Sequence, residues 1–243
     1  MILTKSNTEK KNKKGSFFKF LNKNKKNFIY SSFKGWTCLE IFRFKVHKNQ
    51  NFQKVFFDNL FKQKNREIEY NFINLDGLIT FEVNKKKFKL TRKFDNLNFT
   101  SHNNNFDLKA SNNSSFYLIK SKNNKKTKKV KKVNYLSSAE IKKRDLWGGN
   151  IVSRVFETEN MTIVLFKLKK NFQFHDEGHK NEQITWLIKG SMDFYRGKNK
   201  KKLKFGNGVD IGKYQPHGGI SNEALGFDVF YPKRSEKRYK KKQ

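Results

Sequence analysis

The feature of this sequence that most restricts its fold is an internal duplication. EYNFINLDG, residues 69–77, is similar to EQITWLIKG, residues 182–190, and both place Glu and Gly eight residues apart. Further on, FKLTRKFDNLNFTSH, which ends at His102, is similar to LKFGNGVDIGKYQPH, which ends at His217. Similarity repeated over this length predicts two copies of one structural module.

The modules are predicted to consist of β-strands. Short runs of aromatic and β-branched residues, such as LITFEV, TIVLFKL and ITWLI, are separated by Asn, Gly and Lys. Several of these runs alternate apolar and polar residues, which is typical of strands. The best helix candidate is SSAEIKKRDLW, where Ser137 and Glu140 have the spacing of a capping box. We therefore predict an all-β chain.

The repeat and the lysine-rich stretches predict the domain organisation. The linker between the modules, KSKNNKKTKKVKKVN, is too charged to lie in a core and is expected to be solvated. The expected segments are a disordered basic tail (1–27), an N-terminal barrel (28–119), a basic linker (120–136), a C-terminal barrel (137–235) and a second basic tail (236–243).

The charge of the chain raises the question of a polyanionic partner. Lys and Arg number 55 against 21 Asp and Glu, which gives a formal net charge of +34. Lysine is in excess together with Asn and Phe, whose codons are all A/T-rich, and it is spread over both halves of the chain. We therefore expect weak, salt-sensitive attraction to polyanions. No specific binding of nucleic acid is expected.

Cysteine content and hydropathy point to a cytoplasmic location. The single cysteine, Cys38, excludes an internal disulfide and a cysteine-based zinc site. No stretch approaches the roughly 20 apolar residues of a membrane span, and the N-terminal region lacks the apolar core of a signal peptide. We expect a cytoplasmic protein with no membrane partner.

The second copy resembles the cupins, which are small double-stranded β-helix (jelly-roll) barrels. The first cupin motif has His-x-His, then Glu or Gln, then a hairpin glycine, and the second has a histidine after a proline turn. GHKNEQITWLIKG and DIGKYQPHGG fill most of both motifs. These two segments are most similar to those of small metal-binding cupins such as uronate-processing pectin-degradation proteins. The resemblance implies two tandem cupin barrels, a fold that hosts many chemistries.

The resemblance also implies a set of metal ligands. Counted back from Gln183, the second cupin histidine falls on His179, whereas the first falls on Glu177. Either Glu177 replaces that ligand, or a local bulge brings in His175, two residues upstream. His217 corresponds to the histidine of the second motif.

The chemistry of these side chains is consistent with a divalent cation. Residues two apart on a strand share a face, so Glu177, His179 and Gln183 are expected to point into the barrel, with His217 opposite. Nitrogen and oxygen ligands fit Mn, Fe, Ni or Zn. Such a set leaves one or two positions for water or substrate, as a Lewis-acid or oxygen-activating centre requires. The alternative is a polar surface turn that binds nothing.

The first copy is expected to hold no metal. At the positions of Glu177, His179 and Gln183 it has, in order, Lys64, Arg66 and Tyr70, and it keeps only His102. Two fixed positive charges would repel a cation at low dielectric. We expect this barrel to serve in packing, and binding of an anion by its two basic side chains is the alternative.

Residues near the predicted ligands are candidates for contact with a substrate. Tyr214 lies three residues before His217, so its hydroxyl is the predicted catalytic or substrate-contacting group. Lys213 or Arg196 could pair with a substrate carboxylate. Aromatic residues that line the pocket or fill the core are Trp186, Phe194 and Phe227.

The predicted function is that of a metal-binding two-barrel cupin. The expected activity is metal-dependent isomerase, lyase or ring-opening chemistry on a small carbohydrate-derived or carboxylate metabolite. A non-catalytic sugar-binding or scaffold bicupin is the first alternative, and a cupin dioxygenase is the second. A third hypothesis is a nucleic-acid-associated protein, and it depends only on the positive net charge. The expected partners are a small-molecule substrate and a second copy of the chain in a homodimer.

Overall fold

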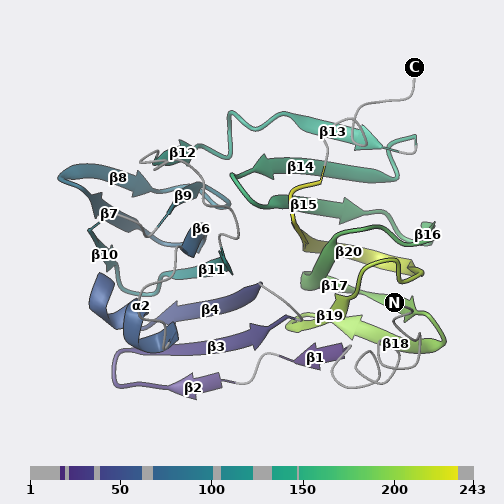
Figure 1. The fold of residues 1–243 in the computed structure, drawn as a ribbon, viewed down its shortest axis with the longest axis horizontal. Coiled ribbons are helices and arrows are strands. Elements are labelled where there is room, and N and C mark those ends of the chain that lie inside the picture. Colours follow the sequence, from purple (N-terminus) through teal and green to yellow (C-terminus); the bar gives the residue numbers. More distant parts are fainter. Residues whose placement is uncertain are drawn as a thin grey trace, which may run out of the picture. The chain divides into compact units, whose positions relative to one another are not determined.

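The structure is a computed structural model that describes residues 17–19, 22–35, 39–61, 68–100, 105–122, 133–146 and 148–234. The chain divides into two compact units: Phe20–Ile141, and Lys142–Gln243 together with Met1–Lys19. Both units are built almost entirely from antiparallel strands (Figure 1), which confirms the prediction of an all-β chain.

The first unit contains two antiparallel sheets. One has seven strands in the order β12-β9-β6-β11-β4-β3-β2, and the other has four in the order β5-β10-β7-β8. The strands are β2 (Asn22–Asn24), β3 (Phe28–Lys34), β4 (Glu40–Val46), β5 (Gln50–Gln53), β6 (Ile68–Asp76), β7 (Ile79–Val83), β8 (Lys86–Leu90), β9 (Asn96–Thr100), β10 (Phe106–Ala110), β11 (Ser115–Lys122) and β12 (Asn134–Leu136).

The core of the first unit is packed with phenylalanine. Phe44 and Phe116 stack with ring centroids 4.7 Å apart, and both lie in one buried cluster with Phe72 and Phe99. Helix α2 (Lys54–Phe61), which the sequence analysis did not predict, buries Phe57 and Phe61 against this cluster. These two residues are four apart, so they lie on one face of the helix. The helix is too short for its periodicity to stand out in the sequence.

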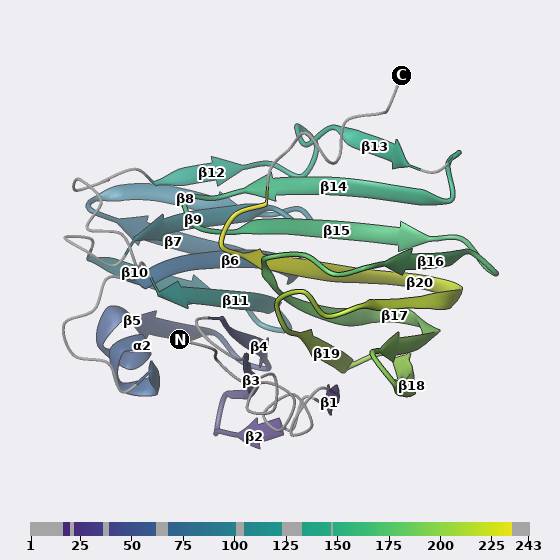
Figure 2. The ribbon, with the colours of Figure 1, turned by 45° about the vertical axis from the view of Figure 1, so that its right-hand side comes forward.

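The second unit forms one nine-stranded sheet with the order β1-β19-β17-β20-β15-β14-β13, where β16 also pairs with β20 and β18 with β17. Its strands lie side by side in Figure 2. They are β1 (Phe17–Lys19), β13 (Lys143–Leu146), β14 (Ile151–Glu157), β15 (Thr162–Leu168), β16 (Gln173–Asp176), β17 (Glu182–Arg196), β18 (Asn199–Lys204), β19 (Asn207–Ile211) and β20 (His217–Tyr231).

A glycine at the same place in both units lets the sheets bend. In the second unit the register of β17 with β20 shifts on either side of Lys189. The adjacent Gly190 has φ +74°, and a Cβ on it would lie 1.7 Å from the carbonyl oxygen of Glu223. Gly77 in the first unit has φ +74°, and a Cβ there would meet Ser114 at 2.7 Å. Since these are the glycines that end the two repeated motifs, the duplication corresponds to a repeated bend.

The predicted helix in SSAEIKKRDLW is wrong. Residues 138–140 form a turn, and the chain then enters β13. The backbone N–H of Glu140 donates to the carbonyl of Ser137 at 3.0 Å, whereas the N–H of Ser138 donates to a carboxylate oxygen of Asp95 at 2.9 Å. Ser137 Oγ accepts from the N–H of Ala139 at 3.4 Å, but the turn ends at Glu140 and no helix follows it.

The predicted tail and linker contain strands. Within the tail predicted for residues 1–27, β1 pairs with β19 and β2 pairs with β3. Within the linker predicted for residues 120–136, β11 continues to Lys122 and β12 pairs with β9. Cys38 lies outside the described residues. No helix among the described residues is long and apolar enough to cross a membrane.

Candidate metal centre

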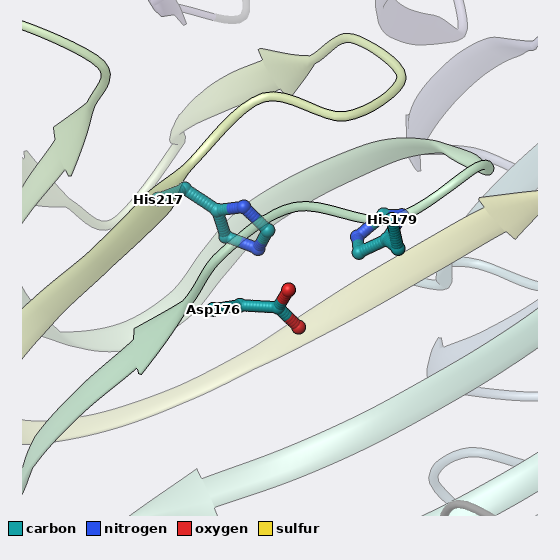
Figure 3. A group of neighbouring side chains, drawn as sticks. All are labelled: Asp176, His179 and His217. Atoms are coloured by element: carbon teal, nitrogen blue, oxygen red, sulfur yellow. The ribbon is translucent and has the colours of Figure 1, made fainter.

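Three side chains of the second unit converge on one point. Asp176 is the last residue of β16, His179 lies in the connection to β17, and His217 is the first residue of β20. One ligand atom from each lies within 4.8 Å of the others. Figure 3 shows the two imidazole rings and the carboxylate pointing toward a common space. Two imidazoles and a carboxylate are donors that could hold a divalent cation.

His217 presents a lone pair from a ring of fixed orientation. Its Nδ1 lies 2.9 Å from the carbonyl oxygen of Gln215. Because a carbonyl only accepts, Nδ1 carries the proton and Nε2 is left with the lone pair. Burial lowers the pKa of His217 below its ordinary value, and the side chain is therefore a neutral imidazole at physiological pH.

His179 is also a neutral ligand candidate. Burial, together with the nearby Arg234, lowers the pKa of His179 to about 4. Its Nε2 lies 2.8 Å from Oε1 of Gln183. Its Nδ1 is buried and has no hydrogen-bond partner among the described residues. A buried ring nitrogen without a partner is costly in a purely structural histidine.

Gln183 is oriented by a network behind the candidate centre. Its Nε2 donates to Oγ1 of Thr185 at 2.8 Å and to Oδ1 of Asp228 at 3.1 Å, and the hydroxyl of Thr185 donates to the same carboxylate oxygen at 2.6 Å. These bonds direct Oε1 of Gln183 toward His179. Burial raises the pKa of the Asp228 carboxyl to about 6.

Asp176 is held from two directions. The backbone N–H of Gly178 donates to its Oδ1 at 2.9 Å, and Nη2 of Arg234 donates to its Oδ2 at 3.2 Å. The guanidinium of Arg234 lies 4.6 Å from the ring centroid of Phe230. Among the described residues, Asp176 is the one acceptor for this guanidinium. The positive charge of the Arg234 guanidinium is therefore buried directly beside Asp176.

The structure brings together some of the predicted ligands and not others. His179 and His217 converge, and Asp176, which was not predicted, joins them. Gln183 contacts His179 through its Oε1. Glu177 instead accepts a hydrogen bond from Nε2 of His175 at 2.7 Å, with 86% of its side chain exposed.

The prediction for Glu177 depended on a strand through His179 and Gln183 in which alternate residues share a face. Residues 177–181 are not strand, and Gly178 turns the chain with φ +108°. The period of two therefore fails over this segment.

The other predicted site residues lie at the edge or in the core. Tyr214 is 73% exposed, and its backbone N–H donates to the carbonyl of His179 at 2.7 Å. The Phe194 ring stacks on His217 at 6.2 Å. The core residues are Trp186 and Phe227, whose rings stack at 5.2 Å, and Arg196, which donates to the carbonyl of Asp210 at 3.1 Å. Lys213 is exposed.

Strand register identifies the matching positions in the first unit. In the second unit, Asp176 and Arg196 both pair with His217. In the first unit, the first residue of the matching strand β10 is Phe106, which pairs with Val83. Phe106 and Val83 thus pair in the first unit as His217 and Arg196 pair in the second, with apolar side chains in place of polar ones.

The first unit has no comparable group of ligands in its described part. Tyr70, the predicted counterpart of Gln183, is buried among aromatic rings, and burial raises its pKa. Lys64, Arg66 and His102, on which the other predictions for this barrel depend, lie outside the described residues. What the structure describes here is an aromatic interior.

Comparison with known proteins identifies the fold. No family model matches the chain, and no curated protein matches its sequence. The structure is similar to oxalate decarboxylase from Lactobacillus farciminis in a formate complex, with TM-score 0.68, 10% identity, and 90% of this chain and 86% of that chain covered. It is similar to protein Ylba of E. coli, with TM-score 0.68, 14% identity and coverage of 90% and 92%.

A third similar structure is a cupin 2 conserved barrel domain protein from Leptotrichia buccalis. Its TM-score is 0.56 at 13% identity, with 87% of this chain and 92% of that chain covered. At such low identities the likeness concerns the fold alone. The chain has the cupin jelly-roll fold in two tandem copies, as the duplication and the resemblance to cupins predicted.

Proposed function

On the premise of a two-barrel cupin fold, we propose that the second barrel is a metal-dependent enzyme site for a small carboxylate metabolite. The observation that carries the proposal is the convergence of Asp176, His179 and His217 within 4.8 Å. Both imidazoles are kept neutral by burial, which is the protonation state that a metal ligand needs.

The residues present fit a divalent cation of the first transition row. Asp176 offers a carboxylate oxygen, and each of the two histidines offers a ring nitrogen. Gln183, predicted as a ligand, instead supports the ring of His179: its amide oxygen accepts from Nε2–H of His179, which leaves the lone pair on Nδ1. A partnerless buried nitrogen on His179 supports a role beyond packing. A cation held here would polarise a substrate oxygen as a Lewis acid.

Arg234 favours a carboxylate over a neutral sugar as the substrate. Only one of its guanidinium nitrogens is engaged among the described residues, by Asp176. The guanidinium rests on Phe230, which fixes its plane. A guanidinium fork with free donors binds a carboxylate in a bidentate manner. We assign Arg234 to substrate binding, with Tyr214 at the rim contacting the exposed end of the substrate. Isomerase, lyase or ring-opening chemistry and a dioxygenase reaction are alike compatible with such a site.

A non-catalytic bicupin is the second candidate, and one observation favours it. The cation of Arg234 pairs with Asp176 beside the ligands, and a positive charge at this place opposes a dication. In that case the barrel would bind a small anion or sugar without metal. The amount of metal that the protein retains separates the two candidates.

The test is metal binding by the full chain. We expect MnCl2, FeSO4, NiCl2 or ZnCl2 to raise the melting temperature of the wild type and to be retained at about one equivalent after dialysis. The His179→Ala/His217→Ala variant should show neither effect, whereas His47→Ala, at an exposed histidine of the first unit, should behave like the wild type. Equal shifts in all three proteins would contradict the site. A screen of uronates, keto-acids and oxalate then addresses the substrate.

A further inference from the structure

A second group of hydrogen-bonded side chains lies on the outer face of the same sheet. His175, Glu177 and Tyr195 form a chain of two hydrogen bonds. Nε2 of His175 lies 2.7 Å from Oε1 of Glu177, and Nδ1 of His175 bonds to the hydroxyl of Tyr195. Because a carboxylate only accepts, Nε2 carries the proton and Nδ1 accepts from the phenol.

Strand register explains how His175 reaches Tyr195. His175 on β16 pairs with Gly218 on β20, and Gly218 pairs with Tyr195 on β17. The two side chains therefore start two strands apart, about 10 Å. They meet because Gly218 has no side chain. A Cβ on Gly218 would lie 2.5 Å from the tyrosine hydroxyl and 2.3 Å from the carbonyl oxygen of Phe174.

The next row of the same three strands contains the candidate metal ligands. Asp176 pairs with His217, and His217 pairs with Arg196. Directly opposed residues share a face and successive residues alternate. The row of His175 therefore faces outward, and the row of Asp176 faces inward. Asp176 stands in the sequence between His175 and Glu177, the two residues that are bonded to each other on the outer face.

β16 is a short strand whose inner side is held by the packing of Phe174 on Phe194 and by the ion pair of Asp176 with Arg234. It is four residues long, and among the described strands it pairs with β20 alone. The bond from His175 to Tyr195 ties it to β17, a strand that is not its neighbour. We call the set of His175, Tyr195 and Glu177 the outer clasp.

We propose that the outer clasp positions Asp176 for metal binding, with His175 and Tyr195 as positioning residues. The clasp keeps His175 and Glu177 outside and so fixes Asp176 inside. This inference rests on the proposed metal site. The clasp is largely solvent-exposed, with side chains of His175 and Glu177 that are 47% and 86% exposed, so its loss costs little global stability. Its effect is local to β16.

The test compares Tyr195→Phe with Tyr30→Phe, which removes a hydroxyl from a half-buried tyrosine of the first unit. In isothermal titration of the full chain with MnCl2, Tyr195→Phe should weaken Mn²⁺ binding by about tenfold or more. Its metal-free melting temperature should change by no more than about 2 °C. Tyr30→Phe should match the wild type in Mn²⁺ affinity. Equal Mn²⁺ affinity in wild type and Tyr195→Phe overturns the proposal.

A matched pair at His175 separates the two hydrogen bonds. His175→Asn keeps an acceptor near the position of Nδ1 and should retain most of the Mn²⁺ affinity, whereas His175→Ala should lose as much as Tyr195→Phe. Equal losses in the two variants would contradict positioning through Tyr195.

Amide hydrogen exchange tests the clasp independently of metal. If the wild type bound no Mn²⁺, the proposed function would fail, and exchange would still decide whether the clasp restrains β16. The amides of residues 173–176 should exchange faster in metal-free Tyr195→Phe than in the wild type. Unchanged exchange would overturn the proposal.

Discussion

The imidazole rings of His179 and His217 lie with their centroids 5.4 Å apart and their planes at 89°. His179 belongs to the first cupin-like motif and His217 to the second, and both side chains are buried. With one ligand atom of each ring within 4.8 Å of the other, two neutral imidazoles in this arrangement could bind one cation.

Replacing Arg234 should change metal and carboxylate binding in opposite directions. Arg234→Gln removes a positive charge beside the ligands, so Mn²⁺ affinity should rise by about tenfold. The affinity of the Mn²⁺-loaded protein for a carboxylate such as oxalate should fall by about tenfold or more, because the guanidinium fork is lost. Isothermal titration measures both, with Arg154→Gln as the control. A parallel fall of both affinities would instead indicate a loss of structure.

Asp228→Asn should stabilise the protein at neutral pH. Burial raises the pKa of Asp228 from 3.8 to about 6, so the stability linked to its protonated form is complete below 3.8 and is lost as pH rises through 6. Asparagine keeps an acceptor for Thr185 without the buried charge. We expect a gain of about 1–3 kcal/mol in the free energy of unfolding at pH 7.5, measured in urea.

Near pH 4 the gain from Asp228→Asn should nearly vanish, because Asp228 is then protonated in the folded protein. The exposed Asp193→Asn serves as the control. A gain of equal size at pH 7.5 and pH 4 would show that burial of the charge is not its cause.

Protonation of His179 should lower the free energy of unfolding of the metal-free protein as pH falls. The pKa of His179 is about 4 in the folded chain, whereas the unfolded value is about 6.5. The unfolded state binds the proton more readily in this window, so the free energy of unfolding falls between pH 6.5 and 4. His179→Gln should reduce this slope by up to about 1.4 kcal/mol per pH unit, whereas His47→Gln should leave it unchanged. Asp228 makes the free energy of unfolding change with pH in the opposite direction. The effect of His179 is therefore the difference in slope between His179→Gln and the wild type.

Gly190→Ala should be far more destabilising than Gly197→Ala. Both glycines have positive φ, +74° and +53°, which costs an alanine about 1 kcal/mol. At Gly190 the added Cβ would also lie 1.7 Å from the carbonyl oxygen of Glu223, whereas nothing lies within 4 Å at Gly197. We expect a loss of more than about 3 kcal/mol at Gly190 and about 1 kcal/mol at Gly197, by urea denaturation. Similar losses would mean that the bend of β17 relaxes easily.

Much of the fold follows from the sequence because strands have a local signature. The repeated motifs end in Gly77, between β6 and β7, and in Gly190, at the irregular register within β17, and both have positive φ. The helix α2 and the turn at Ser138 were mispredicted for different reasons. Two buried phenylalanines give a weak helical pattern in α2. At Ser138 a capping pattern is followed by a single turn that is tied to distant Asp95 and leads into β13.

The sequence by itself determined that a β-module occurs twice, and it predicted that His179, Gln183 and His217 would meet in the second copy. The first inference depends on the repeated spacing of apolar runs and glycines, and the second on the resemblance of two segments to the cupin motifs. Only the tertiary structure added Asp176 and Arg234 to the site and moved Glu177 to the outer face. The physical reason is that alternation ends where Gly178 turns the chain. Before Gly178, the pairing of β16 with β20 places Asp176 beside His217, and after it His179 returns to the same side.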